Sequence, residues 1–127
     1  KVNDVDQSDF VMGLGITDTT PLDTTDGVFF ISADGDAGLD FLVEKDNSAT
    51  TTEDVATMAD DTFITTTWFI DSNASKVYYS INNADPVGVA ITNLPDDEEL
   101  TVSFGIQNGE ASAQTMTIDY VVAAVER

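Results

Sequence analysis

Three kinds of side chain are absent or scarce in this 127-residue chain, which has no histidine, no cysteine and only four basic residues. Histidine is the usual acid–base catalyst near neutral pH, and cysteine and lysine are common nucleophiles. The sequence therefore lacks most of the side chains that enzymes use, and it predicts a protein without enzymatic activity. The absence of cysteine also excludes disulfide bonds and thiolate zinc sites.

Acidic residues dominate the charge of the chain. Lys1, Lys45, Lys76 and Arg127 face 24 acidic residues, which gives a net charge of −20. Nucleic acids and anionic membrane surfaces both attract clustered Lys and Arg, so the charge argues against either as a partner. No apolar run approaches the roughly 20 residues that span a bilayer. The charge favours instead a divalent cation or a basic patch on another protein.

Apolar residues alternate with polar ones along most of the chain, most clearly at residues 100–106 and 116–122. A period of two is typical of strands with one buried face and one solvated face. The many threonines fit the same interpretation, because β-branched side chains suit a pleated surface. Further strands are expected at residues 10–16, 28–32, 39–44, 54–58, 63–71, 76–82 and 86–91.

Turn-forming pairs separate these segments, among them Asp34-Gly35, Asn82-Asn83 and Asn108-Gly109. Strands about every ten residues, divided by such turns, predict an all-β protein with an antiparallel two-sheet jelly-roll sandwich. The length suits a single β-sandwich domain over residues 1–127. The residues expected in its core are Trp68, Phe104, Ile106, Ile118 and Tyr120.

One segment has acids at alternate positions, as a calcium loop does: Asp34, Asp36 and Asp40. An EF-hand loop would need Gly at its sixth position and Glu at its twelfth, where this chain has Leu39 and Lys45. A tight hairpin turn explains the same residues better. A calcium site at the three aspartates stays open as the alternative, and no other cofactor is indicated.

Two aromatic residues, Trp68 and Tyr78, raise the hypothesis of a sugar-binding platform, since aromatic faces stack on sugar rings. Tyr78 is the better exposed candidate, because Val77, Tyr79 and Ile81 occupy the alternate positions that would form the other face of the strand. For Trp68 a core position is the better explanation, since aromatic side chains dominate β cores.

The last segment of the chain, residues 115–125, ends with consecutive apolar residues. Val121, Val122 and Val125 make both faces of this predicted strand apolar, which a solvated edge strand would not tolerate well. We therefore expect these three valines to be buried by an adjacent sheet or by another subunit.

Several segments resemble known families. The sequences FITTTWFID (63–71), KVYYSIN (76–82) and PVGV (86–89) are similar to the paired strands of concanavalin A-like and laminin-G-like jelly rolls. Residues 94–110 and 115–122, together with 10–16 and 38–45, resemble uncharacterised virion proteins of tailed phages, including marine phages.

The phage resemblance implies a structural virion protein, most simply a capsid decoration or head-surface protein at the capsid surface. Its implied partners are the major capsid protein or other virion subunits, and further copies of itself in a homo-oligomer. Members of that group look longer at the N-terminus, which implies that this chain is the C-terminal part of a longer protein and that N-terminal strands are missing. The alternative is a carbohydrate-binding, lectin-like module of a phage fibre or surface protein.

Overall fold

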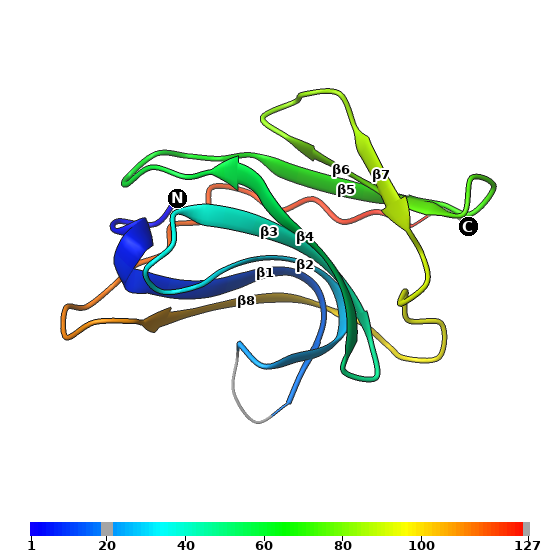
Figure 1. Ribbon diagram of the computed structural model, residues 1–127, viewed down its shortest axis with the longest axis horizontal. Coiled ribbons are helices and arrows are strands. Elements are labelled where there is room, and N and C mark those ends of the chain that lie inside the picture. Colours follow the sequence, from blue (N-terminus) through cyan, green and yellow to red (C-terminus); the bar gives the residue numbers. More distant parts are fainter. Residues whose placement is uncertain (19–21, 126–127) are drawn as a thin grey trace.

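Eight strands in two antiparallel sheets build the fold, as the computed structural model shows for residues 1–18 and 22–125 (Figure 1). The five-stranded sheet has the order β4-β3-β2-β1-β8, and the three-stranded sheet has the order β5-β6-β7. A 3₁₀ turn, η1 (Val5–Gln7), precedes the first strand. The strands are β1 (Ser8–Thr17), β2 (Thr24–Ser32), β3 (Gly38–Lys45), β4 (Ser48–Thr57), β5 (Thr66–Asp71), β6 (Lys76–Ile81), β7 (Val87–Ala90) and β8 (Thr101–Asn108).

Consecutive strands pair as hairpins from β1 to β4, and β8 returns from the far end of the sequence to pair with the free edge of β1. The prediction of an all-β protein with two antiparallel sheets is confirmed. The jelly-roll connection pattern stays a prediction, because β1 to β4 remain within one sheet. Among the described residues, no helix is long and apolar enough to cross a membrane.

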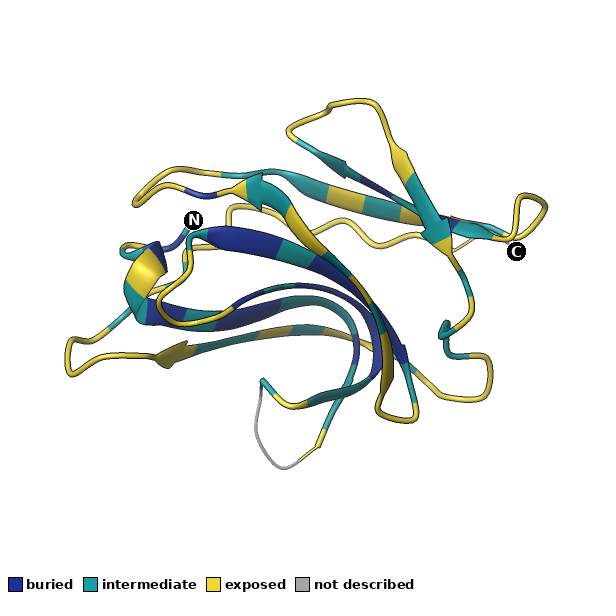
Figure 2. Cartoon of the chain, viewed as in Figure 1, coloured by how far each residue is buried: buried dark blue, intermediate teal, exposed yellow. Residues whose placement is uncertain are grey.

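The core lies between the middle strands of the larger sheet and β6 (Figure 2). Phe30 of β2 and Phe41 of β3 are fully buried, and Tyr79 of β6 meets them from the smaller sheet. The ring centroids of Phe41 and Tyr79 lie 4.8 Å apart, and those of Phe30 and Phe41 lie 5.0 Å apart. Since burial of apolar surface is the main driving force of folding, these rings hold the two sheets together.

The predicted core needs correction at three positions. Ile106 and Trp68 are partly buried and pack against the core, as expected, but Phe104, Ile118 and Tyr120 are exposed. For Phe104, the reason is the unequal width of the sheets. With two strands fewer, and strands about 4.8 Å apart, the smaller sheet is roughly 10 Å narrower and leaves β8, at the edge of the larger sheet, partly uncovered.

The strand predicted at residues 116–122 is also wrong. Only Met116 has a β-partner there, in an isolated antiparallel bridge with Val2. Residues 117–125, here called the C-terminal segment, form no strand, because a strand needs a neighbour for its backbone groups. Elsewhere the predicted strands are found with shifted ends. The largest shift is in β4, which begins at Ser48 instead of residue 54.

A second, smaller cluster lies on the outer face of the larger sheet, where Phe29 is fully buried and packs with Leu42 and Leu22. The ring of Phe29 lies directly over the backbone of β1. A Cβ atom at Gly15 would come within 2.1 Å of the Phe29 ring, and one at Gly13 would come within 2.8 Å of the Phe29 Cα. These glycines let the ring lie against the sheet.

Candidate functional site

The three aspartates of the predicted calcium loop lie in the β2–β3 hairpin, which turns at Asp34-Gly35 as expected. The Asp36 carboxylate accepts a hydrogen bond from the backbone N–H of Gly38 at 2.7 Å, and the Asp40 carboxylate accepts one from the N–H of Asp54 at 2.8 Å. Within residues 1–18 and 22–125, no three acidic side chains lie close enough to hold a metal ion. The structure therefore gives these aspartates roles in the backbone turn and strand and does not bring them together as calcium ligands.

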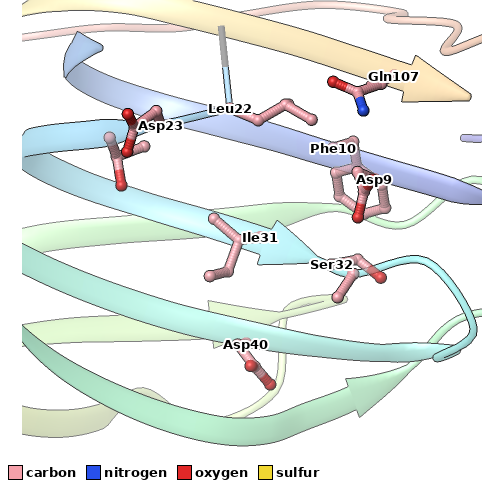
Figure 3. Close-up of a pocket in the computed structure, with 10 residues that line it drawn as sticks. Asp9, Phe10, Leu22, Asp23, Ile31, Ser32, Asp40 and Gln107 are labelled. Carbon is pink, nitrogen blue, oxygen red and sulfur yellow. The ribbon is translucent and has the colours of Figure 1, made fainter. Parts of the chain in front are cut away.

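A pocket of about 430 Å³ lies on the outer face of the larger sheet (Figure 3). Asp9 from β1, Asp40 from β3 and Asp23 from the segment before β2 line it, with Leu22 and Ile31 between them. The Asp9 carboxylate already accepts a hydrogen bond from the backbone N–H of Asp34 at 2.7 Å. Three carboxylates disfavour an anionic ligand, and sequence reasoning had singled out only Asp40 among them.

Two acids of the larger sheet are buried, Asp26 on β2 and Glu44 on β3. The Glu44 carboxylate accepts a hydrogen bond from the Thr24 hydroxyl at 2.6 Å. Burial raises the pKa of Glu44 above its ordinary value, and the nearby Asp26 and Asp23 raise it further, while the Thr24 hydrogen bond opposes the shift. No lysine or arginine among the described residues forms an ion pair with it. Glu44 is therefore a structural acid whose ionisation opposes folding.

The two residues of the predicted sugar platform lie on opposite faces of the smaller sheet. Trp68 is opposite Tyr79 in the β5–β6 ladder and shares its core-facing side, whereas Tyr78 is opposite Phe69 on the outer side. Neighbouring residues of a strand point to opposite faces, so Trp68 and Tyr78 cannot form one platform. The aromatic partner of Tyr78 is Phe69, which sequence reasoning missed.

Phe69 and Tyr78 form a stacked aromatic pair on the outer face, here called the Phe69–Tyr78 platform. Their ring centroids lie 5.1 Å apart with an interplanar angle of 14°, and Phe69 is 46% exposed. Gly88 lies beside Tyr78 on β7, where a Cβ atom would approach the Tyr78 ring to 2.8 Å. The Lys76 ammonium donates a hydrogen bond to the Gly88 carbonyl at 3.3 Å. This platform can stack on a planar or ring-shaped apolar group.

The C-terminal segment exposes a row of large apolar side chains. Val122 is 82% exposed and Val125 is 86% exposed, and Ile118, Tyr120 and Val121 are also exposed. The expectation that an adjacent sheet of this chain buries Val121, Val122 and Val125 is therefore wrong. The physical reason is that the segment pairs with no strand among the described residues. Figure 2 shows the segment in the colour of exposed residues. Burial by another subunit stays a prediction.

A cavity of about 700 Å³, here called the apolar cavity, is lined by β5, by the C-terminal segment and by the larger sheet. Its lining residues include Trp68 and Ile70 of β5, Phe104 of β8 and Phe10 of β1. In Figure 1 the C-terminal segment (red) runs along β5 for most of its length. Lys1 and Val2 also line the cavity, and burial lowers the pKa of the Lys1 α-amino group.

Comparison of the chain with models of protein families, with curated proteins and with solved structures found no match. The functional interpretation therefore depends on three surfaces: the acidic pocket, the Phe69–Tyr78 platform, and the C-terminal segment with its apolar cavity. The apolar cavity is larger than the acidic pocket, and large exposed apolar side chains gather on the C-terminal segment beside it.

Proposed function

We propose that this chain is a non-enzymatic structural subunit that acts through protein–protein contacts. The observation that carries the proposal is the exposed apolar C-terminal segment, above all Val121, Val122 and Val125. Monomeric proteins rarely expose a contiguous apolar surface of this kind unless a partner covers it. A homo-oligomer or another structural subunit would bury it.

The proposed place of assembly is the capsid surface of a tailed phage, with the major capsid protein or other virion subunits as partners. Support for the virion comes from the resemblance of residues 94–110 and 115–122 to virion proteins of tailed phages. The net charge of −20 is compatible with this role, because an acidic subunit complements basic patches on a shell and keeps the particle soluble.

The double variant Val121→Asp with Val125→Asp tests the interface. Both valines are exposed, and neither belongs to the core cluster or packs against it. We expect the variant to stay folded, to lose its oligomeric state in size-exclusion chromatography and to stop binding phage capsids. Val87→Asp, at a 50% exposed valine on β7, is the matched control and should change neither. Retained assembly and capsid binding in the double variant would refute the proposal.

A second candidate function is carbohydrate binding, as in a lectin-like module of a phage fibre or surface protein. The stacked Phe69 and Tyr78 rings favour it, because the Phe69 ring is 46% exposed and aromatic rings can stack on sugars. A glycan array run with and without calcium tests it. Binding that Phe69→Ala abolishes, and that Tyr120→Ala at an exposed tyrosine elsewhere preserves, would support this function. No glycan bound under either condition would exclude it.

A further inference from the structure

The first residues of the chain already pair with the beginning of the C-terminal segment. The backbone N–H of Thr117 donates to the Lys1 carbonyl at 2.8 Å, and the Lys1 α-amino group donates to the Thr117 carbonyl at 2.9 Å. Val2 and Met116 follow as the next antiparallel pair. These contacts are one end of an antiparallel ladder whose direction and register are set at Lys1.

On their other side, Lys1 and Val2 contact residues 61–63, which precede β5. The Val2 carbonyl accepts a hydrogen bond from the backbone N–H of Asp61 at 2.8 Å. The Lys1 ammonium lies 3.3 Å from the Asp61 carboxylate and 5.4 Å from the centroid of the Phe63 ring. Residues 1–3 therefore lie between the C-terminal segment and the approach to β5, with backbone hydrogen bonds to both.

The two segments that flank Lys1, the C-terminal segment and β5, continue past Lys1 with no strand between them. The C-terminal segment has no strand partner, and among the described residues β5 pairs only with β6. The apolar cavity of about 700 Å³ lies between the two flanks, with Lys1 and Val2 at its lining. A volume of this size would hold on the order of 20 water molecules at about 30 Å³ each, against mainly apolar walls.

We propose that a strand of the same polypeptide, joined to Lys1 through its α-amino group, fills the apolar cavity. It pairs antiparallel with the C-terminal segment on one side and with β5 on the other. The smaller sheet then has five strands in the order C-terminal segment, added strand, β5, β6, β7, and it matches the width of the larger sheet. The unpaired backbone groups of both flanks gain partners, and Phe104 is covered.

The register predicts the length and pattern of the added strand. Because Lys1 lies opposite Thr117, eight further residues reach from position 118 to Val125. Val2 faces the core, and the side chains of a strand that runs back from Val2 would point alternately away from the core and toward it. The first, third, fifth and seventh residues before Lys1 then point into the cavity, and we expect them to be apolar.

The same polypeptide is a better occupant than a second copy, because its backbone is already aligned at Lys1 and its docking has no cost in association entropy. The proposal does not depend on the proposed assembly function. The C-terminal segment becomes an edge strand whose even-numbered side chains, Val122 among them, face the core. Its outer edge and odd-numbered side chains, including Val121 and Val125, remain free to contact another subunit.

A disulfide test reads the register directly, because the chain has no cysteine of its own. The protein carries its natural residues before Lys1, with Ile118→Cys and a cysteine immediately before Lys1. These positions form a non-hydrogen-bonded pair with Cα atoms about 4.5 Å apart, within the range of a disulfide. A cysteine two residues before Lys1, again with Ile118→Cys, is the matched control, since it faces the other side. We expect a monomeric disulfide in the first variant only.

Other occupants give other results. A disulfide-linked dimer would overturn the proposal in favour of a second copy, and a lipid that copurifies with the unmodified protein would assign the cavity to a small apolar ligand. Hydrogen exchange gives a second measurement. Deleting the residues before Lys1 should speed exchange at amides 118–125 by about tenfold or more. No disulfide and unchanged exchange, or too few natural residues before Lys1 to reach Val125, would overturn the proposal. None of these results depends on particle binding.

Discussion

Replacing Phe41 by alanine should destabilise the protein more than a change at any aromatic residue near the sheet edges. Phe41 is fully buried on β3, and its ring contacts Phe30 in its own sheet and Tyr79 in the opposite sheet, at centroid distances of 5.0 and 4.8 Å. The substitution removes contacts within the larger sheet and between the sheets, and it leaves a cavity in the middle of the core.

The expected loss is about 3–5 kcal/mol, the usual cost of Phe→Ala in a core. Domains of this size are stable by about 5–15 kcal/mol, so the variant would lose at least about a fifth of its stability. With a urea m-value of about 2 kcal/mol/M, a loss of 4 kcal/mol lowers the denaturation midpoint by about 2 M. Urea denaturation followed by tryptophan fluorescence measures this shift, since Trp68 packs against the same core.

Phe104→Ala is the matched control. In a protein of residues 1–127, Phe104 is 38% exposed on the edge strand β8, so its loss should cost only about 1–2 kcal/mol. Equal losses for Phe41→Ala and Phe104→Ala would show that the core does not lie between β3 and β6. A double-mutant cycle of Phe41→Leu with Tyr79→Leu adds a second check, because a ring pair should couple by about 0.5–1.5 kcal/mol. Coupling near zero would refute the contact between the sheets.

Three further predictions concern single positions. Gly15→Ala should destabilise by about 1–3 kcal/mol, because its Cβ would overlap the Phe29 ring, and unchanged urea denaturation would contradict that packing. Burial raises the folded-state pKa of Glu44, so ionising Glu44 lowers stability as pH rises from 4.5, its unfolded value, through the raised pKa. Glu44→Gln should therefore be more stable than the parent above this window and gain nothing below pH 4.5; an equal gain at all pH values would exclude the linkage. Lys45 lowers the pKa of Asp96 by an ion pair, so Lys45→Gln should raise it in an NMR titration, and an unchanged pKa would show that the pair does not form in solution.

The alternation of residues is local, and it was enough to place most strands. Residues 10–16 and 39–44 were predicted as strands, and they lie within Ser8–Thr17 and Gly38–Lys45. The turn at Asp34-Gly35 was likewise predicted from the residues that favour such turns. The first six residues of β4 were missed, because Ser, Thr, Ala and Glu give no apolar period there.

Pairing and burial depend on neighbours distant in sequence, and the tertiary structure alone decided them. Residues 116–122 alternate as clearly as 100–106, yet only the latter lie in a strand with a partner, β1. The Phe69–Tyr78 platform also depends on a strand pairing that the sequence pattern could not predict. Tyr78 was placed on an outer face from its own strand, but its partner Phe69 follows from the β5–β6 register.

The chain's amino acids by themselves determined the strand period, the turns and the charge, because each depends on residues close together in sequence. The tertiary structure determined which strand faces are covered, since burial requires an opposing sheet. Phe41 and Phe104 both occupy apolar positions of alternating strands, and only Phe41 is fully buried. The difference arises because the three-stranded sheet reaches over β3 but does not fully cover β8, at the edge of the five-stranded sheet.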